Sequence, residues 1–77
     1  MEEEIEERIM NVLKLQRAGT AEEIAFTIAE LQGIATEEGV AETVVAVKEQ
    51  VKRLTMDARL EEIRSKHSSK RYKLAEH

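Results

Sequence analysis

The last third of the chain limits the possible folds more than any other segment. Two short stretches with apolar anchors flank a polar, cationic one: Leu60 and Ile63 come before it, and Tyr72 and Leu74 follow it. The alternation of Tyr72 and Leu74 is typical of a strand, so the pattern predicts a β-hairpin over about residues 59–75. Leu60 and Ile63 have opposite parity in a regular strand. We therefore expect one of them to lie outside the strand, or a bulge to intervene.

Three helices are predicted before the hairpin, over about residues 2–18, 20–32 and 37–54. In the first, apolar residues form one stripe at Ile5, Ile9, Val12 and Leu13. Gly19 is the predicted left-handed residue that stops this helix.

The second helix opens with Thr20-Ala21-Glu22-Glu23, which has the pattern of a capping box. Its inward face is predicted to hold Ile24, Ala25, Ile28 and Leu31. Phe26 lies off this face, and we expect it to be packed in the core rather than to contact a partner.

The third helix is predicted to begin between Thr36 and Ala41, with Gly39 weakening its first turn. A heptad-like apolar seam runs along it through Val40, Val44, Val47, Val51 and Leu54. The seam is too short for a coiled coil, so it should pack against the first two helices. β-branched valines are mediocre helix formers, and burial of this face must therefore stabilise the helix.

The size of the chain, 77 residues, predicts one domain spanning residues 1–77. With no cysteine, neither a disulfide nor a thiolate metal site is available, and a reducing, cytoplasmic location is expected. The longest apolar run has four residues, so no membrane partner is expected.

The net charge of −4 conceals an asymmetry. Residues 1–50 carry twelve acids against four bases, and residues 51–77 carry eight bases against four acids. An acidic average argues against indiscriminate nucleic-acid binding. A local cationic field still acts within a Debye length of roughly 8 Å.

The chain resembles the winged helix-turn-helix superfamily over nearly its whole length. The residues that carry the resemblance are the valine seam with Glu42 and Thr43, then Leu60-Glu61-Glu62-Ile63, then Arg71-Tyr72-Lys73-Leu74, with Thr20 to Ala25 matching the start of the second helix. The resemblance implies a mainly α fold with a small β-hairpin (α+β), a three-helix winged-helix domain. It also implies DNA binding with the third helix in the major groove and the hairpin on the backbone or in the minor groove.

The outward face of the third helix departs from that pattern. With the seam inward, this face carries Glu42, Val45, Ala46, Glu49 and Arg53. Base-reading helices usually present Arg, Lys, Asn, Gln or Ser, and two glutamates beside phosphates are unfavourable. We expect a weak or atypical sequence reader.

The cationic residues are the predicted nucleic-acid contacts. Five lie in the hairpin and three on the third helix. The two lysines of the helix lie on one flank, from which we expect them to reach phosphates. They are Arg64, Lys66, Lys70, Arg71, Lys73, Lys48, Lys52 and Arg53. Such groups supply salt-sensitive affinity rather than sequence choice. The alternative interpretation is a solvated hairpin whose lysines prevent edge-to-edge pairing.

No enzyme is predicted. The serines Ser65, Ser68 and Ser69 lie beside His67 on one turn, with no separate base and no pocket. The three glycines are isolated in the sequence, so no glycine-rich phosphate loop is expected. The side chains of adjacent acids point in different directions, and the two histidines lie ten residues apart, so neither a metal site nor a cofactor is expected.

The first functional hypothesis is a small DNA-binding protein, a transcriptional regulator, with affinity carried mainly by the hairpin. So few cations should bind weakly, so a homodimer on a two-fold site is expected, formed through the first helix or Phe26. The alternative is a protein-interaction module of a transcription or chromosome-associated assembly that uses Glu42, Val45, Ala46 and Glu49. RNA binding is the third possibility, although Tyr72 is its only stacking aromatic in the hairpin.

Overall fold

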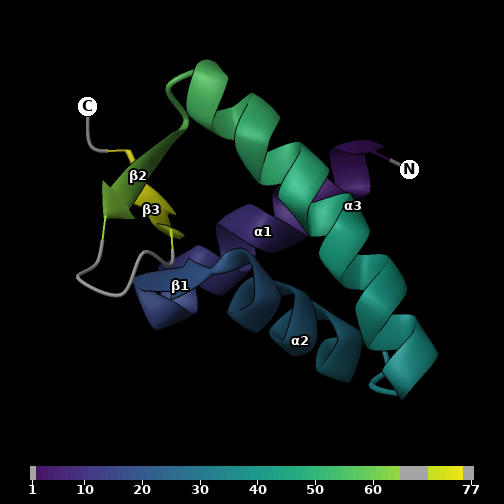
Figure 1. Cartoon of the computed structure of the whole chain (residues 1–77). Helices are drawn as coiled ribbons and strands as arrows, with labels where there is room; N and C mark the ends of the chain where they lie inside the picture. Colours follow the sequence, from purple (N-terminus) through teal and green to yellow (C-terminus); the bar gives the residue numbers. More distant parts are fainter. Residues whose placement is uncertain (1, 65–69, 76–77) are drawn as a thin grey trace.

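Three helices pack together with a small antiparallel sheet at one side of them (Figure 1). The computed structural model describes residues 2–64 and 70–75, except for the side chains of residues 2 and 3. The elements are α1 (Glu2–Gln16), β1 (Ala18–Thr20), α2 (Ala21–Leu31), α3 (Glu37–Met56), β2 (Leu60–Arg64) and β3 (Lys70–Leu74). The strand order β1-β3-β2 places β3 in the centre. This is a winged-helix layout, and the predicted α+β class with three helices and a hairpin is confirmed.

Side-chain caps begin α2 and α3. Thr20 accepts a hydrogen bond from the backbone N–H of Glu23, whose carboxylate accepts from the backbone N–H of Thr20, so the predicted capping box is confirmed. Thr36 caps α3 by accepting from the N–H of Gly39 at 3.0 Å. The start of α3 lies within the predicted window, and its end at Met56 comes two residues later than predicted.

The core lies between the three helices and the inner face of the sheet. Val47, Val51 and Leu54 of α3 are at most 1% exposed, which confirms the C-terminal part of the predicted seam. Val40 and Val44, nearer the start of α3, are only partly buried. Tyr72 and Leu74 share one face of β3 and pack against the core, as predicted. Burial of one aliphatic side chain contributes about 1.5–3 kcal/mol, so this seam holds α3 in place.

The end of α1 differs from the prediction. The helix stops at Gln16, and Arg17, with a φ of 68°, is the left-handed residue instead of Gly19. Gly19 is buried in β1, where it pairs with Tyr72 of β3. The prediction missed this three-residue strand. Ala-Gly-Thr has little strand character of its own and forms a strand because the edge of β3 supplies hydrogen-bond partners.

Phe26 was predicted to lie in the core, and this is wrong. The side chain is 49% exposed on the outer side of α2. Small and aliphatic residues of α2 fill the inward positions, and the ring is left on the outer side of the helix.

The expected irregularity in β2 is also absent. Leu60 pairs with Leu74 and Ile63 with Arg71 in one regular antiparallel register. The two apolar residues simply point to opposite faces: Leu60 is buried at 2% exposure, and Ile63 is partly buried on the outer face.

Candidate nucleic-acid interface

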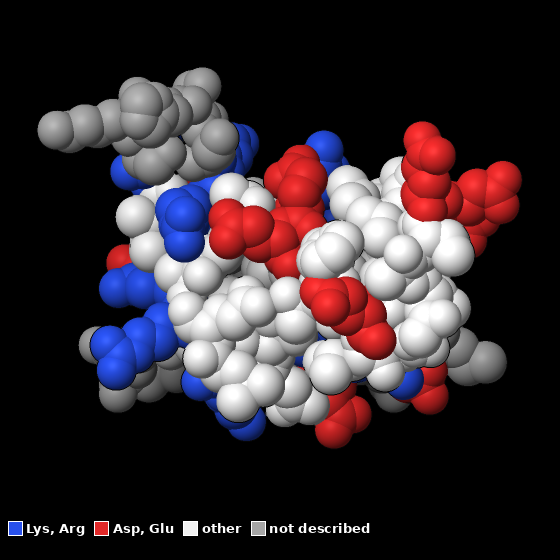
Figure 2. All heavy atoms as spheres, turned by 90° about the horizontal axis from the view of Figure 1, so that it is seen from below, with Lys and Arg blue, Asp and Glu red and all other residues white. Residues whose placement is uncertain are grey.

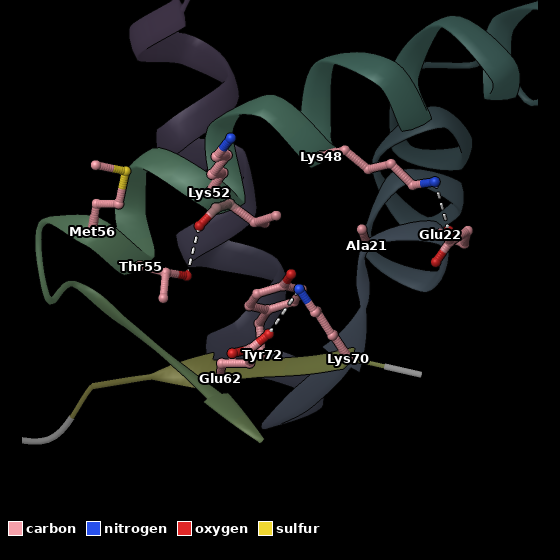
Figure 3. Close-up of a pocket in the computed structure, with 10 residues that line it drawn as sticks. Ala21, Glu22, Lys48, Lys52, Thr55, Met56, Glu62, Lys70 and Tyr72 are labelled. Carbon is pink, nitrogen blue, oxygen red and sulfur yellow. Dashed lines mark hydrogen bonds and ion pairs between the residues drawn. The ribbon is translucent and has the colours of Figure 1, made fainter. Parts of the chain in front are cut away.

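An open cleft of about 660 Å³ separates α3 from the sheet (Figure 3). Lys48 and Lys52, one turn apart on α3, line it from above, and Lys70 rises from β3 beside the ring of Tyr72. The hydroxyl of Thr55, which donates to the Val51 carbonyl at 2.7 Å, lies on the α3 wall. Cations from two elements distant in sequence thus border one concave surface.

The register of the hairpin divides the predicted cations between the two faces of the sheet. Arg64 pairs with Lys70, so both side chains are on the face that carries Tyr72 and looks toward α3. Arg71 and Lys73 alternate with these positions and are on the opposite face. The hairpin is therefore two small basic surfaces, of which one continues the cleft.

Carboxylates of the same domain pair with most of these cations. Lys48 meets Glu22 of α2 at 3.2 Å, and Lys70 meets Glu62 of β2 at 3.5 Å. On the outer face, Lys73 meets Glu61 at 3.5 Å and Arg71 meets Glu23 at 3.7 Å. Exposed ion pairs contribute about 0–1 kcal/mol, so an incoming phosphate can replace a carboxylate at little cost. Within the described part of the chain, Lys52 and Arg64 form no ion pair.

Glu22 has a perturbed titration. Its backbone N–H, in the first turn of α2, and the ammonium of Lys48 hold the pKa of its carboxyl below the ordinary value of 4.5. The first turn of a helix favours negative charge, so Glu22 is ionised over the neutral range and keeps Lys48 oriented toward α2.

Of two further predicted contacts, Arg53 does not join the cleft, and Lys66 is not among the described residues. Arg53 is exposed on α3, about 140° around the helix from Lys48 and about 100° from Lys52. It does not line the cleft. Lys66 falls in segment 65–69, outside the described residues, as do Ser65, His67, Ser68 and Ser69.

The outward face of α3 has the composition that the sequence predicted. Glu42, Val45 and Glu49 are exposed, Val45 by 68%, and Ala46 is partly buried. This face carries two carboxylates, whereas Lys48 and Lys52 of α3 line the cleft.

Several residues of the cleft could not be recognised from the sequence. Thr55, Glu22 and Glu62 reach it only because α2 and the sheet pack on either side of the C-terminal half of α3. Figure 2 looks onto the side where α2 lies: most of the visible Lys and Arg side chains are on the sheet side, and acidic side chains lie among uncharged ones over the centre. The charge asymmetry of the sequence is therefore also an asymmetry in space.

Comparisons with protein-family models, with curated proteins and with solved structures find no match. No described helix is long and apolar enough to cross a membrane. Among the described residues, no three His, Asp or Glu side chains are grouped so that they could hold a metal ion.

Proposed function

We propose that this protein binds double-stranded DNA, with the cleft between α3 and the sheet holding the phosphate backbone. The observation that carries the proposal is the placement of Lys48, Lys52 and Lys70 around one cleft, with Arg64 beside Lys70 on the same sheet face. Ammonium groups on a concave surface neutralise phosphates and release their counterions, which supplies affinity at low salt.

The expected selectivity is low. Phosphate contacts position a protein on DNA but carry no sequence information directly. The outward face of α3 offers Glu42, Val45 and Glu49 instead of the Arg, Asn or Gln side chains that match base edges. A few lysines, partly paired with carboxylates, should give weak binding by one copy, so two copies on a two-fold site are part of the proposal.

The salt dependence of binding tests the proposal. Binding of the full chain to a short DNA duplex is measured by fluorescence anisotropy over a series of salt concentrations. Changing Lys52 and Lys70 together to Ala should weaken binding uniformly across sequences and reduce the slope of log K against log salt by about two units.

A lysine outside the cleft provides the matched control. Lys14 is exposed on α1 and does not line the cleft, so Lys14→Ala should leave the slope nearly unchanged. Lys70 and Arg71 are on opposite sheet faces, so their double change would probe two surfaces at once. If the Lys52 and Lys70 double variant keeps the wild-type slope, the cleft does not bind the backbone.

The exposure of Val45 favours one alternative, a protein partner bound to the outward face of α3. Val45 is 68% exposed between Glu42 and Glu49, which suits a basic partner. Val45→Lys should then abolish partner binding and leave DNA affinity unchanged. A loss of DNA affinity on removal of the cleft lysines, with no effect of Val45→Lys on any interaction, would dismiss this alternative.

A further inference from the structure

A second hollow lies over the outer side of α2, between β1 and the first half of α3. Its apolar lining comes from Ala18, Phe26, Val40 and Val44, with Phe26 half exposed at 49%. Glu22 lines both this hollow and the lysine cleft, so its ion pair with Lys48 stands between the two sites. The hollow is thus a separate surface from the one proposed to bind DNA.

Glutamates outnumber cations around the hollow. Residues 18–47, which form β1, α2 and the first half of α3, contain six glutamates and no Lys, Arg or His. Glu22 and Glu23 line the hollow, and Glu30 is exposed one turn after Phe26 on the same side of α2. Arg71, the one cation among the lining residues, is paired with Glu23 at 3.7 Å.

Figure 2 shows this side of the molecule, with acidic side chains over its centre. A phosphate backbone would be repelled there, so DNA is a poor occupant of the hollow. An apolar surface bordered by carboxylates instead matches a protein segment of opposite pattern, with aliphatic side chains between lysines or arginines.

We propose that this hollow docks a basic amphipathic segment of a partner protein. Its aliphatic side chains contact Phe26, Val40 and Val44. Its cations face Glu30 and compete with Lys48 and Arg71 for Glu22 and Glu23. A half-exposed aromatic ring within an apolar lining is the type of residue that contributes most to a protein interface. Because the lysine cleft stays open, the partner and DNA bind at the same time.

A designed peptide tests this docking without knowledge of the natural partner. The probe is a synthetic helix with Leu at positions i, i+3, i+4 and i+7 and Lys on both flanks. It is added to the isotope-labelled full chain at about 150 mM salt, and amide shifts are recorded by NMR. We expect the largest shifts around Phe26, Val40 and Val44, and little response to a matched peptide in which Glu replaces every Lys.

Two variants make the test specific. Phe26→Ala should weaken binding of the Leu/Lys peptide at least about tenfold. Leu31→Ala, which removes an even more exposed apolar side chain from another side of α2, should change the affinity for this peptide less than about twofold. Glu30→Lys tests the charge of the rim by an exposed change that leaves the core intact, and it should also weaken binding.

Three results would overturn the docking proposal. They are equal binding of the two peptides, wild-type affinity in both Phe26→Ala and Glu30→Lys, and shifts confined to the lysine cleft. Concentration-dependent shifts in the hollow without peptide would assign it to a second copy of the chain and so also contradict the proposal. Loss of DNA binding in the cleft variants bears on none of these results, so the two proposals fail independently.

Discussion

Replacing Gly39 by alanine should destabilise the protein, although alanine is the better helix former. Gly39 is in the first turn of α3, where a Cβ atom would lie 2.1 Å from the carbonyl oxygen of Ile34 and 3.1 Å from its carbonyl carbon. Real Cβ contacts essentially never fall below 3.0 Å, so the start of α3 must move away by at least 0.9 Å.

The loop before α3 resists that movement. The Ile34 N–H donates to the Ala29 carbonyl at 2.9 Å, and the Ile34 oxygen accepts from the Thr36 N–H at 2.7 Å. Moving α3 also separates the Gly39 N–H from its cap, the Thr36 hydroxyl, at 3.0 Å. Both attachments of the helix start are therefore affected by one methyl group.

The expected net loss in the free energy of unfolding is about 1–3 kcal/mol. Overpacking costs about 1–3 kcal/mol, the cap contributes about 1 kcal/mol, and the gain in helix propensity from Gly to Ala offsets about 1 kcal/mol. A domain of this length has a total stability of roughly 4–11 kcal/mol, so the loss is a large share of it.

Urea unfolding followed by circular dichroism measures the effect, and the other glycines are its controls. At Gly19 the nearest atoms to a Cβ are 3.6–3.7 Å away, so Gly19→Ala should cost less than about 0.5 kcal/mol. Gly33 has open space but a φ of 72°, so Gly33→Ala should cost about 1 kcal/mol through backbone strain. A Gly39→Ala variant as stable as the wild type would refute the steric argument.

Three further predictions concern the core and the rim of the cleft. Val47→Ala and Val51→Ala should each lower the free energy of unfolding by about 1–3 kcal/mol, because both side chains are at most 1% exposed; a negligible loss in urea titrations would remove them from the core. Gln50→Met should raise the free energy of unfolding by about 1 kcal/mol, because Gln50 is 3% exposed and its Oε1 has no hydrogen-bond partner within the described part of the chain. A fall in the urea midpoint would show that this amide is hydrogen-bonded in the folded protein. Glu22→Gln should reduce the loss of stability in acid. The folded-state pKa of Glu22 is lowered, so its ionised carboxylate stabilises the fold above the unfolded pKa near 4.5, and this stabilisation is lost as pH falls through the folded value. The thermal midpoint is measured at about pH 6 and about pH 3. If it falls equally in the variant and the wild type, this prediction is contradicted.

Most of the candidate site could be named from the sequence, but its arrangement could not. Lys48, Lys52, Arg64 and Lys70 were identified by charge alone. The pairing of β2 with β3 then decides which cations face α3, and a register shifted by one residue would exchange Lys70 for Arg71. The opposing carboxylates come from other elements, so their effect on the lysines depends on tertiary packing.

The sequence by itself determined the presence of the three helices, the capping box that begins α2 and the class of fold. Local patterns sufficed there, because the Thr20 capping box and the valine seam act within a few turns of one helix. The tertiary structure decided the features that depend on distant partners. Strand β1 forms because the edge of β3 supplies hydrogen-bond partners, and Arg17 takes the left-handed conformation where the chain turns into that strand. Phe26 is exposed because smaller side chains occupy the inward face of α2. Each of these outcomes is set by contacts between residues far apart in the chain, which a local sequence pattern does not contain.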